Sequence, residues 1–301
     1  MTRATASVWL VGFLMGCGGA APAGGAATGG ESSGESAESA QRQREDALVQ
    51  SPKLLAPVKG TKAAESRFAS IDFQLTLSRE DGAPAGIQSA SWSLDEKRSY
   101  EVVDVSGKVI RELRVTFGAR EGNALLGLEP HAATSGQSFV VAAKAGKLSL
   151  TKPDGGSVSI NEEAGLSEYA WTGKPSPLLV WLDGGTVPSG EKRSGEAEHA
   201  RALIGELPGV DPKKTKLEVT SKGESQGALG LDVHAIVLVE SGPTILELDL
   251  TGPAQIDRKT GFVTELSLTG SVKPRGKMDT KKGLLAVSGS GKAEVRRRIE
   301  W

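Results

Sequence analysis

The chain has 301 residues, with 36 Lys and Arg against 37 Asp and Glu and an isoelectric point near 6.4. This balance argues against nucleic acid or an anionic membrane face as a charge-driven partner. The single cysteine, Cys17, excludes an intramolecular disulfide, so the fold must depend on its core for stability.

A short apolar stretch near the amino terminus ends at this cysteine. Arg3 supplies a positive charge, Val8 to Met15 are apolar, and Leu14-Met15-Gly16-Cys17 closes the run. About eight apolar residues are too few for a transmembrane helix, which needs about 20. A plain secretory peptide followed by an ordinary cysteine is the alternative to a lipid anchor.

The tetrad Leu14-Met15-Gly16-Cys17 resembles the lipobox of bacterial lipoproteins. The resemblance implies that residues 1–16 are a signal peptide and that Cys17 carries acyl chains such as palmitate. It also implies a membrane anchor in the bacterial cell envelope. Gly18, directly after the cysteine, resembles a signal for the outer membrane.

Residues 17–50 are predicted to be a flexible tether. Gly18 to about Asp46 consists almost entirely of Gly, Ala, Ser and Glu. Such a composition cannot bury enough apolar surface to offset the loss of chain entropy on folding. A short helical turn over Gln41 to Val49 is the alternative within this segment.

The remaining chain is predicted to be mainly β, in two β-rich halves at 51–190 and 191–301. Ile71, Phe73, Leu75 and Leu77 alternate with polar residues, which places all four side chains on one face of a strand. The same alternation recurs in other segments: Ala90-Trp92-Leu94, Leu113-Val115-Phe117, Leu246-Leu248-Leu250 and Leu266-Leu268. Alternation of this kind favours antiparallel, curved sheets with one solvated face.

Three short helices are expected between the halves. They begin near Asn161, at Ser176-Pro177 and after Ser194, and Pro208-Gly209 ends the third. The Gly-, Ser- and Pro-rich segment from Asp183 to Gly195 is the predicted boundary between the two halves.

Three further segments resemble a group of uncharacterised proteobacterial envelope lipoproteins of similar length. These segments are Gly136 to Val141, Lys147 to Leu150 and Gly173 to Pro177. The group has no known activity, so the resemblance implies an envelope lipoprotein without implying a mechanism.

Motifs that suggest catalysis or metal binding lack residues that these functions require. Ser288 to Lys292 is similar to a phosphate-binding loop, but Ala293 replaces the Ser or Thr that binds Mg²⁺, so a β-turn is favoured. His131, His199 and His234 lie far apart and lack a second ligand at metal-binding spacing. We therefore predict no catalytic, cofactor-binding or metal-binding residue.

Two charged groupings have structural interpretations. Asp232 and His234 share one face of a predicted strand, and a solvated or cross-strand hydrogen-bonded pair is the favoured interpretation. If Ala293 to Trp301 is a strand, Arg297 points to the apolar face while Arg296 and Arg298 point to solvent. Arg297 must then pair with a carboxylate or extend its charged end to water.

Three function classes follow from these observations. The favoured hypothesis is a non-catalytic, membrane-anchored envelope lipoprotein with a structural or partner-binding role, whose core is filled. The alternative is a carrier of apolar, lipid-like cargo on a half-barrel sheet, by analogy of fold with outer-membrane lipoprotein carriers. An envelope hydrolase is third. Expected partners are the membrane, through the acyl chains, and envelope proteins or lipid; no cofactor and no nucleic acid are expected.

Overall fold

A computed structural model describes residues 32–123, 132–144, 147–205, 210, 214–241, 244–280 and 283–301. The chain divides into two compact units, 1–39 and 40–301, and the second unit contains the whole sheet. The lipobox and Cys17 lie outside the described residues, so their predicted roles stay predictions. Within the described residues, no helix is long and apolar enough to cross a membrane.

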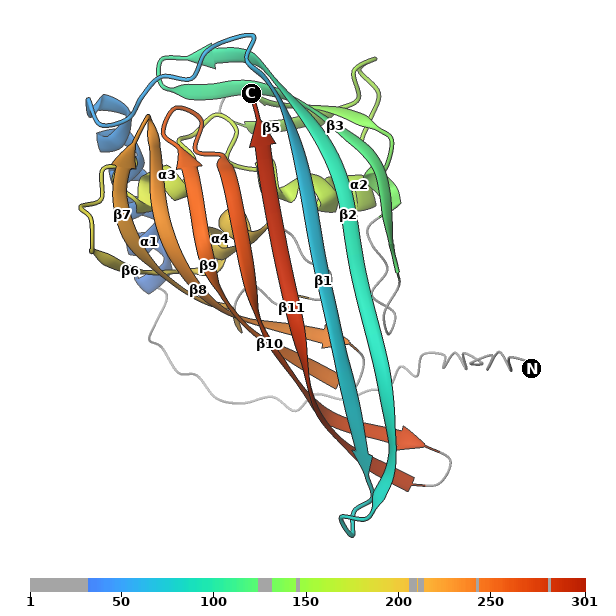
Figure 1. Ribbon diagram of the computed structural model, residues 1–301. Helices are drawn as coiled ribbons and strands as arrows, with labels where there is room; N and C mark the ends of the chain where they lie inside the picture. Colours follow the sequence, from blue (N-terminus) through green and yellow to red (C-terminus); the bar gives the residue numbers. More distant parts are fainter. Residues whose placement is uncertain are drawn as a thin grey trace, which may run out of the picture. The chain divides into compact units, whose positions relative to one another are not determined.

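The protein is mainly β, as the alternating pattern predicts (Figure 1). The first group of strands comprises β1 (Lys62–Ser78), β2 (Pro84–Ser106), β3 (Val109–Asn123), β4 (Ser138–Lys144) and β5 (Lys147–Thr151). The second group comprises β6 (Lys192–Gly195), β7 (Lys216–Ser225), β8 (Ala228–Ser241), β9 (Thr244–Asp257), β10 (Val263–Thr280) and β11 (Gly283–Glu300). The helical elements are α1 (Ser32–Gln50), η1 (Ala132–Thr134), α2 (Ile160–Leu166), η2 (Ser167–Tyr169), α3 (Pro177–Trp181) and α4 (Ala197–Ile204).

Both β-rich halves belong to one antiparallel sheet. Within the described residues its strand order is β5-β4-β3-β2-β1-β11-β10-β9-β8-β7-β6. The two halves meet where β1 pairs with β11, from Ala64 opposite Glu300 to Ser78 opposite Ala286. The first and last strands therefore lie side by side at the centre of the sheet, and short helices separate the halves in the sequence.

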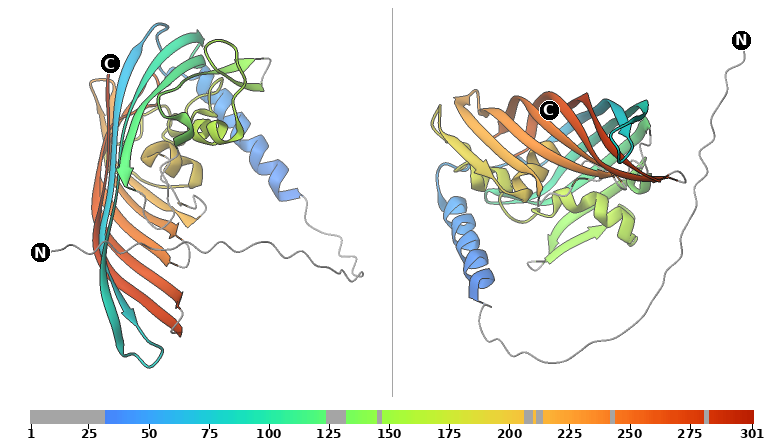
Figure 2. Two further views of the ribbon diagram at one scale, coloured as in Figure 1. Left: turned by 90° about the vertical axis from the view of Figure 1, so that its right-hand side faces the viewer. Right: turned by 90° about the horizontal axis from the view of Figure 1, so that it is seen from below.

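The sheet is curved, and the short helices α2, α3 and α4 lie on its concave side (Figure 2). We call this concave side the inner face. Ile71, Phe73, Leu75 and Leu77 are all buried on it, whereas the polar residues between them are exposed. The predicted phase of the alternation is therefore confirmed.

Glycines on the inner face permit the curvature. A Cβ added at Gly270 of β10 would overlap the backbone carbonyl oxygen of Asp249, and one at Gly289 of β11 would overlap that of Gln74. Neighbouring strands thus approach more closely at these points than any other residue would permit, as expected where a sheet bends sharply.

The structure corrects two predictions. Ser288 to Lys292 form neither a phosphate-binding loop nor the favoured β-turn, because they lie within the continuous strand β11. The tether is also not a coil throughout, because α1 is helical from Ser32 to Gln50 and Leu48 is buried. The helix extends well beyond the turn considered for Gln41 to Val49, because Leu48 joins the apolar core and adds tertiary packing.

The three predicted helices exist, and two of them start at other residues than predicted. Ser159 caps α2: its Oγ accepts from the Glu162 amide, and its own amide donates to the Glu162 carboxylate at 2.7 Å. Pro177 is the first residue of α3, as predicted. Ser194 lies in β6, and Glu196 caps α4 instead. This helix ends at Ile204, before Pro208-Gly209, which lie outside the described residues.

Candidate functional site

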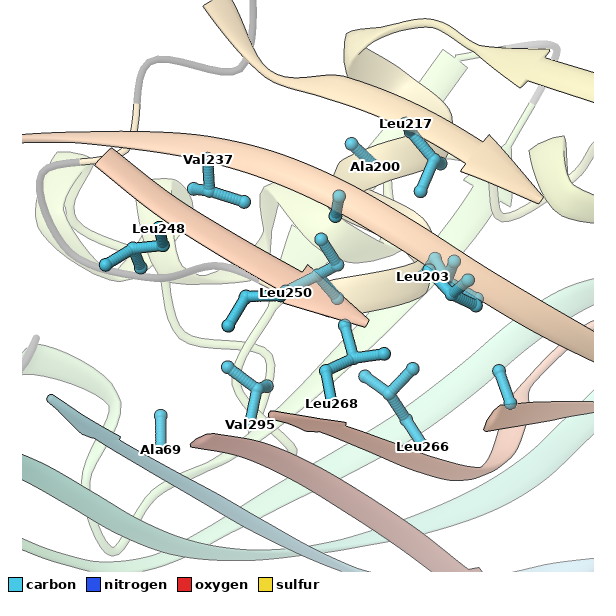
Figure 3. Close-up of a cluster of buried hydrophobic side chains, with 14 of the residues drawn as sticks. Ala69, Ala200, Leu203, Leu217, Val237, Leu248, Leu250, Leu266, Leu268 and Val295 are labelled. Atoms are coloured by element: carbon cyan, nitrogen blue, oxygen red, sulfur yellow. The ribbon is translucent and has the colours of Figure 1, made fainter. Parts of the chain in front are cut away.

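The inner face carries a continuous, mainly aliphatic surface over β1, β2 and β7 to β11, which we call the aliphatic surface. Its buried side chains are Ala69, Ile71, Phe73, Leu75, Leu77, Trp92, Leu94, Leu217, Val219, Leu229, Leu231, Val233, Ala235, Val237, Val239, Leu246, Leu248, Leu250, Ala254, Ile256, Leu266, Leu268, Val272, Val287, Ala293 and Val295. Figure 3 shows Leu248 and Leu250 of β9 and Leu268 of β10 pointing into a common interior with Val295 of β11.

A helical cap, defined as α2, η2, α3 and α4, lies on the inner face. Its helices α3 and α4 cover the aliphatic surface, whereas Leu166 of α2 and Tyr169 of η2 pack in a second buried cluster beside it. Leu178 and Leu179 of α3 and Ala200, Leu203 and Ile204 of α4 are buried in the same cluster as the aliphatic strand residues. In Figure 3, Ala200 and Leu203 lie among the strand side chains. The curvature of the sheet together with α3 and α4 therefore buries the aliphatic side chains of the inner face.

Next to the aliphatic surface, a row of buried charges crosses the sheet. Arg67 of β1 lies directly opposite Glu96 of β2 on one side and Arg297 of β11 on the other. Two residues before Arg67 on β1, Glu65 also faces inward and lies opposite Arg98 of β2. All five residues are at most 7% exposed.

The aliphatic surface begins at the next inner-facing position. There Leu94, Ala69, Val295 and Leu268 form a row across β2, β1, β11 and β10. Inner-facing positions on one strand are about 7 Å apart. The charged row and the aliphatic surface are therefore immediate neighbours.

The side chain of Glu168, in η2 of the cap, contacts the arginines of this row. Its Oε2 accepts hydrogen bonds from Arg67 Nη1 at 2.7 Å and Arg98 Nη1 at 2.9 Å. Its Oε1 accepts from Arg67 Nη2 and, at 3.3 Å, from Arg297 Nη2. Three guanidinium groups thus converge on one carboxylate, which itself is nearly inaccessible to solvent.

Arg297 also connects the sheet to α4. Its Nη1 donates to the carbonyl oxygens of Ala202 and Leu203, each at 3.1 Å, at the negative end of the helix. Gly205 follows the helix with φ of 91°, and a Cβ there would contact Arg67 Nη1. A glycine at this position therefore suits both the left-handed backbone and the approach of the arginines.

The remaining partners complete the ionic cluster, which we define as Glu65, Arg67, Glu96, Arg98, Arg120, Glu168 and Arg297. Glu65 pairs with Arg67 Nε at 2.8 Å and Arg297 Nε at 2.9 Å and accepts from the Tyr100 hydroxyl. Glu96 pairs with Arg98 at 2.8 Å and with Arg120 at 2.9 Å. The Tyr169 hydroxyl accepts from Arg98 Nη1 at 2.7 Å.

Burial and the neighbouring arginines set the protonation states of the cluster. Burial alone would raise the pKa of Glu168, but the charges of Arg67 and Arg98 outweigh it and hold that pKa well below 4.5. The pKa values of Glu65 and Glu96 are lowered for the same reasons. Burial raises the pKa of Tyr169 to about 12. The carboxyl groups are therefore ionised and the phenol neutral at pH 7.

The side chains considered in the sequence are mostly dispersed. His234 Nε2 lies 2.9 Å from Asp249 Oδ1 on the neighbouring strand, and Asp232 pairs with Lys222 at 2.6 Å. His234 and Asp232 thus form cross-strand pairs on the solvated face, as the favoured interpretation predicts. His199 Nδ1 accepts from the Glu196 amide, and the ring stacks on Trp181. His131 and Cys17 lie outside the described residues.

Arg297 pairs with carboxylates on the inner face, as predicted, but the rest of the ionic cluster was missed. The signal was present in the alternation of β1, because Glu65 and Arg67 have the same inward phase as Ala69 and Ile71. Glu168 had no such signal, because its position depends on the packing of η2 against a sheet built from distant segments. In the described part of the chain, no group of three His, Cys, Asp or Glu residues could hold a metal ion.

Comparison with known proteins shows only distant likeness. No protein-family model and no curated protein matches the chain. A structure described as lipid-protein interactions in lipovitellin is 7% identical, with a TM-score of 0.36, over 81% of this chain and 25% of that one. DynF from the dynemicin pathway of Micromonospora chersina is 10% identical over 80% of this chain and 82% of its own, with a TM-score of 0.17. OpdQ of Pseudomonas aeruginosa is 9% identical over 75% and 68%, with a TM-score of 0.16. The chain spans about a quarter of the lipovitellin chain.

Proposed function

We propose that the protein is a non-catalytic, acyl-anchored protein of the bacterial outer membrane that binds acyl-chain cargo on the inner face of its sheet. The observation that carries this proposal is the aliphatic surface that runs over seven strands of a curved sheet. Leu, Val, Ile and Ala side chains dominate it, and such a lining suits lipid tails better than sugars or stacked rings.

The short helices of the cap support a binding role over a purely structural one. α3 and α4 have five and eight residues, so each is too short to be a stable helix without the sheet. Their aliphatic side chains occupy the surface that an acyl chain would occupy. We infer that cargo replaces these contacts when the cap moves, with little net change in buried apolar area.

Quenching of tryptophan fluorescence tests the proposal. Trp92 is buried on the inner face, whereas Trp301 is half exposed at the carboxyl end of the chain. Two full-length chains would carry Cys17→Ser and retain either Trp92 or Trp301 alone, with the other tryptophans replaced by Phe. A brominated long-chain alcohol, which carries no charge, would then be titrated into each.

The proposal predicts saturable quenching of Trp92 and weak, non-saturable quenching of Trp301. Equal quenching of both residues, or none, would contradict cargo binding at the inner face. A protein that purifies without extractable lipid and also fails to bind the alcohol would leave the structural role as the better account.

A further inference from the structure

We infer that Arg67, Arg98 and Arg297 form a binding site for the anionic head group of the cargo, so that the ligand is an anionic amphiphile. This inference rests on the proposed function and specifies its ligand. In the structure, the Glu168 carboxylate of the cap occupies the site.

The geometry around Glu168 is that of an anion site. Its two oxygens receive four hydrogen bonds from three arginines, including a two-point contact with Arg67. Guanidinium groups bind carboxylate and phosphate oxygens through the same planar, paired geometry. A carboxylate or phosphate head group could therefore replace the Glu168 side chain atom for atom at the hydrogen-bonding positions.

The charge balance also favours an anion. The ionic cluster contains four arginines and three glutamates, and Glu168 is the one glutamate supplied by the cap. When the cap moves away, four arginines face only Glu65 and Glu96. Arg67 and Arg297 lie directly opposite each other in the register, so their repulsion is then less compensated. An incoming anion would restore the balance.

The position of the site matches an amphiphile rather than a free anion. Ala69 and Val295 are the next inner-facing residues after Arg67 and Arg297, and both belong to the aliphatic surface. A head group held by the arginines would therefore place its chain directly on that surface. The hydrophobic effect favours the chain there, at about 0.8 kcal/mol for each buried methylene.

The test compares ligands that share a chain or a head group. Dodecyl phosphate and dodecanoate carry both parts, dodecanol carries the chain alone, and inorganic phosphate carries the head group alone. Affinities would be measured by titration below the micellar range, on full-length Cys17→Ser protein. The variants are Glu168→Ala and Arg297→Gln, with Glu163→Ala and Arg298→Gln as matched controls. Glu163 lies in α2 of the same cap, Arg298 is next to Arg297, and both are exposed.

We expect Glu168→Ala to bind dodecyl phosphate about tenfold more tightly than the parent, because the internal carboxylate no longer competes. Arg297→Gln should lose the preference for dodecyl phosphate over dodecanol, while both controls keep it. Comparison of dodecanoate with dodecyl phosphate then separates a fatty acid from a phospholipid head group. Should Glu168→Ala not fold, Glu168→Gln keeps the side-chain size and removes the charge.

Several results would overturn the inference. If dodecanol binds as tightly as dodecyl phosphate to every variant, the result supports acyl-chain binding but contradicts the anion site. If inorganic phosphate binds Glu168→Ala as tightly as dodecyl phosphate, the site recognises a free anion and not an amphiphile. If no ligand binds any variant, the proposed function falls together with the inference.

Discussion

Arg297 and Arg298 are adjacent in the sequence and occupy opposite chemical environments. Arg297 is 4% exposed and contacts Glu65, Glu168 and two helix carbonyls, whereas Arg298 is exposed and pairs with Glu300 at the surface. Removing one partner of a buried ion pair leaves an uncompensated charge, which costs far more than loss of an exposed pair.

We therefore predict that Arg297→Gln lowers the free energy of unfolding by about 3–5 kcal/mol. Arg298→Gln should change it by less than about 0.5 kcal/mol. Urea unfolding of both variants checks this. Equal effects would show that the inner-face contacts of Arg297 do not exist in solution.

The buried carboxylates also set the response to acid. The pKa values of Glu65, Glu96 and Glu168 are lower in the folded protein than the usual 4.5. Their contribution to stability is thus fully present above pH 4.5 and is lost as the pH falls through the folded-state values. We predict that the unfolding temperature drops steeply below pH 4.5. In Glu168→Gln, which is less stable at pH 7, this drop should be shallower; an identical pH profile would argue against ionised Glu168.

At the scale of elements, the bend of β10 depends on a residue without a side chain. Gly270 faces inward, where a Cβ would overlap the Asp249 carbonyl oxygen of β9, whereas Ser271 faces outward and is exposed. A side chain at position 270 must push the two strands apart, and this disturbs the curve on which the cap rests.

Gly270→Val should therefore destabilise the protein by about 2–4 kcal/mol. Ser271→Val, on the solvated face of the same strand, should change stability by less than about 0.5 kcal/mol. Thermal unfolding monitored by circular dichroism distinguishes them. A tolerated valine at position 270 would mean that the glycine is not needed for the close approach of the strands.

At the scale of the whole molecule, strand phase and helix starts, which depend on neighbouring residues, were predicted from the sequence. Contacts between segments far apart in the sequence were not. The inward phase of Ile71 to Leu77 follows from alternation alone, and Pro177 marked the start of α3. The pairing of β1 with β11 joins segments more than 200 residues apart, so no local pattern encodes it. The same pairing brings Arg67 to Arg297, so the alternation of β1 could place Glu65 and Arg67 on the inner face but could not identify their partner on β11.

The most direct test of the account is hydrogen exchange of the full-length Cys17→Ser protein with and without saturating dodecyl phosphate. Cargo on the inner face must displace the cap, because cap and cargo share one surface. We predict that amides of η2, α3 and α4 exchange faster in the presence of the ligand, while those of β9, β10 and β11 do not. Unchanged exchange throughout the cap at saturation would contradict binding at the inner face.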